Sequence, residues 1–144
     1  MIVPKRKILL IEEEADLQRS ITITLRRAGC DVVAVSNGNQ ALYYIDEAIV
    51  EKDSIDLIMT DLNLPGLSGI ELIDNLRSRG VQAPFAVMTA YGNNSVYATL
   101  REKGCVFCLD KPFNSDQLEW YVSEAFKGGK DGQGNLNESQ GQSI

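Results

Sequence analysis

The sequence predicts an α/β fold in which one parallel sheet of five strands is covered by helices on both faces. Two features of the 144-residue chain carry this prediction. Short apolar runs alternate five times with segments of helical periodicity, and the apolar runs are mostly continuous, without regular polar interruptions. Continuous runs are typical of strands that are buried on both faces, as the strands of parallel sheets are.

The five expected strands are short. They cover residues 7–11, 31–35, 55–60, 84–89 and 106–109. Because a helix lies in every connection between them, the sheet is doubly wound, a (βα)5 arrangement. We expect the flavodoxin-like strand order 2-1-3-4-5, in which ligands bind at the carboxyl ends of the strands, beside the switch point between strands one and three.

The five expected helices follow from apolar residues spaced three or four apart. They cover residues 15–28, 40–51 and 94–103, a stretch from Ser68 or Gly69 to near Gly80, and a stretch from Asn114 or Ser115 to Phe126. The helix over 94–103 has a thin apolar face made of Val96, Ala98 and Leu100. We therefore expect this helix to be mobile or to face a partner.

The domain organisation follows from a change of composition near residue 128. Residues 1–127 are expected to form one domain. Residues 128–144 hold five of the twelve glycines and only two large apolar residues, so we expect a flexible tail or linker there.

Composition and charge exclude several functions. The chain has 14 Lys+Arg and 20 Asp+Glu, a net charge of −6, which disfavours direct binding of nucleic acid or of an anionic membrane. It contains no His, the commonest general base and a common metal ligand. No apolar stretch approaches the length of a membrane span, and no secretory signal is present, so we expect a cytoplasmic protein.

Two of the three cysteines, Cys105 and Cys108, form a C-x-x-C pattern. A redox pair requires its first cysteine at a helix N-terminus, where the helix dipole lowers the pKa of the thiol. These cysteines lie in an apolar run that reads as a strand. We therefore interpret them as buried, inert thiols, with redox or zinc chemistry as the minor alternative.

Charged and polar residues gather where four of the expected strands end. They are Glu12-Glu13-Glu14 after strand one, Asp61 after strand three, Thr89 after strand four and Asp110-Lys111-Pro112-Phe113 after strand five. The fold brings these ends to one edge of the sheet, where neighbouring carboxylates repel one another. A hard divalent cation would relieve this repulsion, and a set of oxygen ligands without His favours Mg²⁺ or Mn²⁺.

Four motifs in this order resemble those of response-regulator receiver domains, the phosphoacceptor domains of two-component signalling. The motifs lie in residues 8–14, 61–69, 88–92 and 110–113. The resemblance covers about residues 5–127. It implies that Asp61 is the phosphorylated aspartate in a magnesium-dependent reaction and that the chain is not a catalytic enzyme.

The resemblance also assigns the residues around Asp61. It implies that Glu13, Asp61 and the backbone carbonyl of Asn63 hold Mg²⁺, with Glu12 as the other member of the acidic pair. It implies that Lys111 contacts a phosphoryl oxygen.

Further roles concern the response to phosphorylation. Thr89 is implied to move toward the phosphoryl group as the switch, with Ala90 and Tyr91 following it in the same loop. The Lys111–Pro112 peptide bond is implied to be cis. The output face would comprise strand four, the helix after it and strand five.

Two departures from the family pattern suggest an alternative. The second acidic position is usually Asp and is Glu13 here, which puts normal metal binding in doubt. The position three before the lysine usually carries Tyr or Phe and is Cys108 here, while Phe107 points to the other face of its strand. Coupling to Thr89 is then weakened or is taken over by Tyr91 or Tyr97. The alternative function is a receiver-like interaction module that phosphorylates poorly.

Enzymes of the same fold class are the second alternative. A flavin site would need a hydroxyl- and glycine-rich phosphate loop after strand one, where this chain has three glutamates, and a haloacid-type phosphohydrolase would need Asp there. The expected partners are instead a histidine kinase or a phosphotransfer protein, with a homodimer through the helix of residues 94–103 and strand five as a further possibility.

Overall fold

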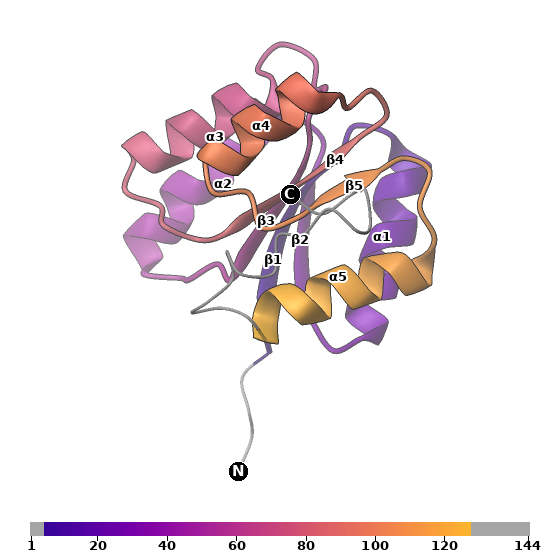
Figure 1. Cartoon of the computed structure of the whole chain (residues 1–144). Helices are drawn as coiled ribbons and strands as arrows, with labels where there is room; N and C mark the ends of the chain where they lie inside the picture. Colours follow the sequence, from indigo (N-terminus) through magenta and orange to yellow (C-terminus); the bar gives the residue numbers. More distant parts are fainter. Residues whose placement is uncertain (1–4, 128–144) are drawn as a thin grey trace.

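Five parallel strands form the centre of the computed structural model, which describes residues 5–127 (Figure 1). The strands are β1 (Lys7–Ile11), β2 (Asp31–Val35), β3 (Leu57–Asp61), β4 (Phe85–Thr89) and β5 (Cys108–Asp110). Their order in the sheet is β2-β1-β3-β4-β5, and every pair is parallel. The predicted fold class and strand order are confirmed, whereas the predicted tail over residues 128–144 lies outside the described residues.

Five helices connect the strands or follow them. They are α1 (Ala15–Arg27), α2 (Gly38–Glu51), α3 (Gly69–Ser78), α4 (Asn94–Glu102) and α5 (Ser115–Lys127). Helices α1 and α5 cover one face of the sheet, and α2, α3 and α4 cover the other (Figure 1). Within residues 5–127, none of these helices combines the length and the apolar character that crossing a membrane would require.

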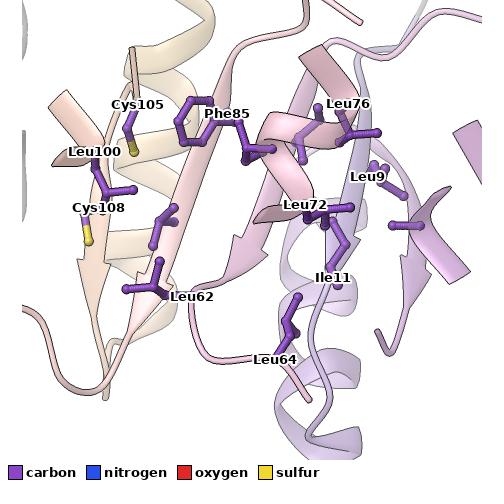
Figure 2. Close-up of a cluster of buried hydrophobic side chains, with 14 of the residues drawn as sticks. Leu9, Ile11, Leu62, Leu64, Leu72, Leu76, Phe85, Leu100, Cys105 and Cys108 are labelled. Atoms are coloured by element: carbon purple, nitrogen blue, oxygen red, sulfur yellow. The ribbon is translucent and has the colours of Figure 1, made fainter. Parts of the chain in front are cut away.

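The two faces of the sheet are separated by the alternation of side chains along each strand. Along β1, Leu9 and Ile11 pack with the α2–α4 layer, while Ile8 and Leu10 pack with α1 and α5. Figure 2 shows the first of these clusters, in which Phe85 lies among leucines from several elements. Because both faces are packed, the strands read as nearly continuous apolar runs.

Side-chain caps mark the starts of α2 and α3, and one of them explains a shifted boundary. Helix α2 begins at Gly38, two residues before the predicted Gln40, because the Asn37 side chain accepts a hydrogen bond from the Gln40 backbone N–H at 2.8 Å. Helix α3 begins after Ser68, which forms a reciprocal capping box with Glu71.

Strand β5 is shorter and lies later than predicted, at Cys108–Asp110 instead of residues 106–109. Residues just before it still bond to β4, because the Val106 N–H donates to the Phe85 carbonyl and the Val87 N–H donates to the Phe107 carbonyl. The apolar character of residues 106–109 predicted a buried segment but not the residue at which regular pairing with β4 begins.

The core face of α4 differs from the prediction. Leu100 is fully buried, and Val96 and Tyr97 pack against the same cluster, while Ala98 is exposed. Residues 96, 97 and 100 share one side of a helix with 3.6 residues per turn, whereas residues 96 and 98 do not. The aromatic ring of Tyr97 therefore fills the place that the prediction gave to Ala98.

Candidate functional site

The site lies at the carboxyl-end edge of the sheet, where the register aligns the ends of the strands. Ile11 of β1 is paired with Thr60 of β3, and Asp61 is paired with Met88 of β4. Glu12 directly follows Ile11, and Asp61 is the last residue of β3. The two residues therefore lie at the ends of neighbouring strands. The register therefore brings these strand ends to one edge of the sheet, as predicted.

Lys111 joins the two buried carboxylates of the site. Its Nζ lies 2.9 Å from Oε1 of Glu12 and 2.8 Å from Oδ2 of Asp61. Glu12 is 1% exposed and Asp61 is 7% exposed, so this ion triad is largely withdrawn from water. Burial lowers the pKa of the Lys111 ammonium, but hydrogen bonds and charge attraction from Asp61 and Glu12 outweigh burial and raise the pKa above its ordinary value.

Backbone N–H groups hold the other oxygens of these carboxylates. Oε2 of Glu12 accepts a hydrogen bond from the Glu14 N–H at 2.9 Å, and Oδ1 of Asp61 accepts one from the Asn63 N–H at 3.0 Å. Both carboxylates are thereby fixed in orientation without a further side chain. One ammonium still serves two buried carboxylates, which leaves the triad with an excess negative charge.

The loop after Asp61 is closed by a tight approach of α3. A Cβ atom on Gly69 would lie 2.6 Å from the carbonyl oxygen of Asp61 and 3.0 Å from Cα of Leu62, both of them backbone atoms. The Gly69 N–H also donates to the Leu62 carbonyl at 2.9 Å. Only glycine therefore allows α3 to begin this close to the end of β3.

Thr89, at the end of β4, is fully buried beside the triad. Its Oγ1 accepts a hydrogen bond from the Tyr91 N–H at 3.1 Å, and its carbonyl accepts one from the Lys111 N–H at 2.8 Å. The Lys111–Pro112 peptide bond is cis, as the sequence resemblance implied. Ala90 and Tyr91 are exposed, and the Tyr91 side chain is 80% exposed.

Of the two tyrosines that could take over the coupling, Tyr97 is the one that contacts β5, and its coupling to Thr89 stays a prediction. Its hydroxyl donates a hydrogen bond to Oδ1 of Asp110 at 2.8 Å, and its ring lies over Gly92, where an added Cβ would meet the hydroxyl at 2.5 Å. Cys108 is buried on this side of the sheet, and Phe107 packs on the opposite side, as predicted.

The donor chemistry of this edge fits a hard divalent cation, because two buried carboxylates and backbone carbonyls supply only oxygen. Glu13 is exposed and directly follows Glu12 in the loop after β1. In the described part of the chain, no group of three or more His, Cys, Asp or Glu residues already forms a metal-binding arrangement. Mg²⁺ binding by Glu13, Asp61, Asn63 and Glu12 therefore stays a prediction.

Sequence reasoning missed two residues that shape the site, Gly69 and Gln18. Gly69 is one of twelve glycines, and only the three-dimensional approach of α3 to β3 marks it. Gln18 donates to the Val35 carbonyl of β2 and to the Glu12 carbonyl just after β1, a contact for which the sequence carries no motif.

Comparisons with known proteins agree with this geometry. The sequence pattern of the response regulator receiver domain family matches residues 8–123. The two-component response regulator PhoP of Pseudomonas aeruginosa is 36% identical over 113 residues, covering 78% of this chain and 48% of that protein. The response regulator protein PilR of the same organism is 28% identical over 123 residues, covering 85% of this chain and 26% of that protein.

Solved structures give the same result for the fold. The signal receiver domain of a Luxo repressor protein from Vibrio parahaemolyticus superposes with a TM-score of 0.78 at 26% identity, covering 88% of this chain and 94% of that domain. The chain spans about half the length of PhoP and about a quarter of the length of PilR.

Proposed function

Because this chain belongs to the response regulator receiver domain family, we propose that Asp61 is its phosphoacceptor. The family consists of phosphoacceptor modules of two-component signalling and is not a class of catalytic enzymes. The single observation that carries the proposal is the Lys111–Asp61 contact. It places an ionised carboxylate at the end of β3, 2.8 Å from an ammonium. An incoming phosphoryl group at Asp61 would have its oxygens within reach of that ammonium.

Transfer at Asp61 is a substitution at phosphorus. A carboxylate oxygen of Asp61 forms a new bond to phosphorus as the bond between phosphorus and the donor atom breaks, and the donor leaves with that electron pair. The products are an acyl phosphate on Asp61 and the free donor. Lys111 stabilises the charge on the phosphoryl oxygens, and the Asn63 N–H keeps the carboxylate oriented.

A divalent cation, Mg²⁺ or Mn²⁺, would be held by Asp61, Glu13 and the carbonyl of Asn63, with Glu12 nearby. When bound, it supplies positive charge at the phosphoryl oxygens. The buried Glu12 carboxylate is engaged by Lys111 and by the Glu14 N–H, so Glu12 has a mainly electrostatic role. The exposed Glu13, in the loop after β1, would instead supply the carboxylate that binds the cation directly.

Thr89 would report the new charge. Its hydroxyl is buried and accepts from the Tyr91 N–H, so turning it toward a phosphoryl oxygen releases that bond and frees the loop after β4. The loop leads directly into α4, whose Tyr97 is tied to Asp110 of β5. Phosphorylation would thereby shift the population of arrangements of β4, α4 and β5.

The phosphodonor would be a histidine kinase or a phosphotransfer protein, and the α4–β5 face would meet a partner or a second copy. The alternative, a receiver-like module that is phosphorylated poorly, is favoured by Glu13 and Cys108. Intact mass after incubation with acetyl phosphate and Mg²⁺ separates the two. We expect one phosphoryl increment that requires metal and is absent in Asp61→Asn. A folded wild-type chain without the increment would point to the alternative.

A further inference from the structure

Gln18, at the end of the first turn of α1, contacts the ends of two strands through its side-chain amide. Its Nε2 donates to the Glu12 carbonyl at 2.9 Å and to the Val35 carbonyl at 3.0 Å, and it lies 3.4 Å from Oγ of Ser36. The last regular pair of β1 and β2 joins Ile11 and Val35. The amide therefore ties α1 to the sheet just where the pairing of these strands ends.

Holding the Glu12 carbonyl also fixes the start of the acidic loop. That carbonyl belongs to the peptide unit between Glu12 and Glu13, which is rigid and planar. An oxygen held at 2.9 Å by Gln18 therefore sets the direction in which the chain leaves Glu12. The Glu12 N–H is held as well, because it donates to the Val35 carbonyl at 3.0 Å.

The two glutamates depend on this backbone to different degrees. Glu12 is buried, and its carboxylate is bound by Lys111 and by the Glu14 N–H. Glu13 is exposed, and the backbone position of its Cα atom sets the region that its carboxylate can reach. A shift of the Glu12–Glu13 peptide would move Glu13 relative to Asp61 while leaving the buried Lys111–Glu12 pair in place.

We propose that Gln18 is a positioning residue for the divalent-cation site. Its amide holds the Glu12–Glu13 peptide in the orientation from which the Glu13 carboxylate reaches a cation bound at Asp61. The inference rests on the proposed function, which assigns the cation to Glu13 and Asp61. Gln18 contacts neither the cation nor the phosphoryl group, and its effect is carried by the backbone.

Two variants remove the donor from Gln18 in different ways. Gln18→Met keeps the length of the side chain and a high helix propensity but cannot donate a hydrogen bond. Gln18→Glu keeps the shape and places carboxylate oxygens against two carbonyl oxygens. Ile21→Val is the matched control, because it removes a buried methyl group from the same helix without changing a contact to the acidic loop.

The main measurement is the Mg²⁺ dissociation constant of the full chain by isothermal titration calorimetry. Gln18→Met should weaken binding about tenfold, as loss of outer-sphere support does in other metal sites. Gln18→Glu should also weaken it, although its added negative charge alone would tighten cation binding. Ile21→Val should bind Mg²⁺ as the wild type does. A residue that only stabilised the fold would leave all these constants equal.

A metal-free measurement gives an independent readout. Amide hydrogen exchange at Glu14, whose N–H donates to Glu12, should accelerate in both Gln18 variants and not in Ile21→Val. If Gln18→Met fails to fold, Gln18→Glu decides the question. Wild-type Mg²⁺ affinity and unchanged Glu14 exchange in a folded Gln18 variant would overturn the inference and leave phosphorylation of Asp61 standing. Absence of Mg²⁺ binding by the wild type would overturn both the metal assignment and the inference.

Discussion

The hydroxyl of Tyr97 in α4 lies 2.8 Å from Oδ1 of Asp110 in β5, immediately before the lysine of the ion triad. The contact links the helix after β4 to the strand that carries Lys111. Burial, together with the hydrogen bond and the charge of Asp110, raises the pKa of Tyr97 to about 12. Tyr97, and not the exposed Tyr91, is therefore the aromatic side chain that links α4 to β5.

Replacement of Tyr97 by Phe removes this hydrogen bond and keeps the ring. We expect a loss of about 1 kcal/mol in the free energy of unfolding and faster amide exchange in α4. Urea unfolding and hydrogen exchange measure both quantities. Tyr91→Phe is the matched control and should change neither. Equal exchange in α4 for the two variants would mean that the Tyr97–Asp110 bond does not hold the helix.

The raised pKa of Tyr97 also predicts a dependence on alkaline pH. A tyrosine whose pKa is higher in the folded chain than in the unfolded chain stabilises the neutral, folded form. This contribution is fully present below about pH 10 and is lost as the pH rises toward about 12. Between these values the wild type should lose more stability than Tyr97→Phe, as followed by urea unfolding. Parallel losses in the two proteins would contradict the assignment.

Lys111→Met leaves the buried carboxylates of Glu12 and Asp61 without a cation. We expect the free energy of unfolding at pH 7 to fall by about 3–5 kcal/mol, the usual cost of breaking a buried ion pair from one side. Asp61→Asn is the matched variant, because it leaves one ammonium with one carboxylate. Its stability should fall by less than that of Lys111→Met. Chemical denaturation of both proteins tests the difference, and a large loss in Asp61→Asn would show that the triad is needed as a unit.

The pKa of Lys111 predicts how this difference in stability changes with pH. Because its pKa is raised in the folded chain, Lys111 contributes stability that is present below its ordinary value of 10.5 and is lost as the pH rises through the raised value. The stability difference between the wild type and Lys111→Met should therefore shrink at the most alkaline pH. A difference that grew there would contradict the raised pKa.

Gly69→Ala tests the approach of α3 to β3. The added methyl group would meet the Asp61 carbonyl and Leu62 Cα, which can move only with the backbone, and we expect a loss of about 2–3 kcal/mol. Gly38→Ala is the comparison, because the atoms nearest to its methyl group would belong to the side chain of Leu67. Thermal and urea unfolding should rank Gly69→Ala as the more destabilised variant. The reverse order would show that the loop after Asp61 yields easily.

Glu13→Asp tests the departure of the acidic pair from the family pattern. Mg²⁺ demands near-octahedral geometry at about 2.0–2.1 Å, and a side chain one methylene shorter restores the reach that the family pattern uses. We expect Mg²⁺ to bind several-fold more tightly and phosphorylation from acetyl phosphate to be faster. Glu14→Asp, at the exposed next position, is the control. Equal affinities for the wild type and Glu13→Asp would remove the reason to regard Glu13 as a handicap.

The cysteines of the C-x-x-C pattern should be unreactive. Cys105 and Cys108 are fully buried; burial raises the pKa of both thiols, that of Cys108 to about 12 with a further contribution from the charge of Asp110. A thiol-specific disulfide reagent at pH 8 should modify neither residue in the native protein and both in urea. Rapid reaction of Cys108 with the reagent in the native protein would support the redox interpretation.

Local patterns in the sequence determined much of the fold of this protein. The apolar runs determined the strands and, with the helical spacing between them, the (βα)5 order of the sheet, because buried parallel strands and amphipathic helices each have their own periodicity. The polar residues at the strand ends were identifiable in the same way, since a doubly wound sheet brings its carboxyl ends to one edge. The strand-end residues therefore followed from the sequence as one group, whereas the structure singled out Glu12, Asp61 and Lys111 within it as the ion triad.

Only the tertiary structure decided the contacts between segments far apart in the chain. Tyr97, and not Ala98, faces the core because the rotation of α4 is set by its packing on the sheet. The closeness of Gly69 to Asp61 and the reach of Gln18 to two strand ends arise from how α3 and α1 dock. Such contacts depend on distances fixed by packing, for which a single sequence has no local periodic signal.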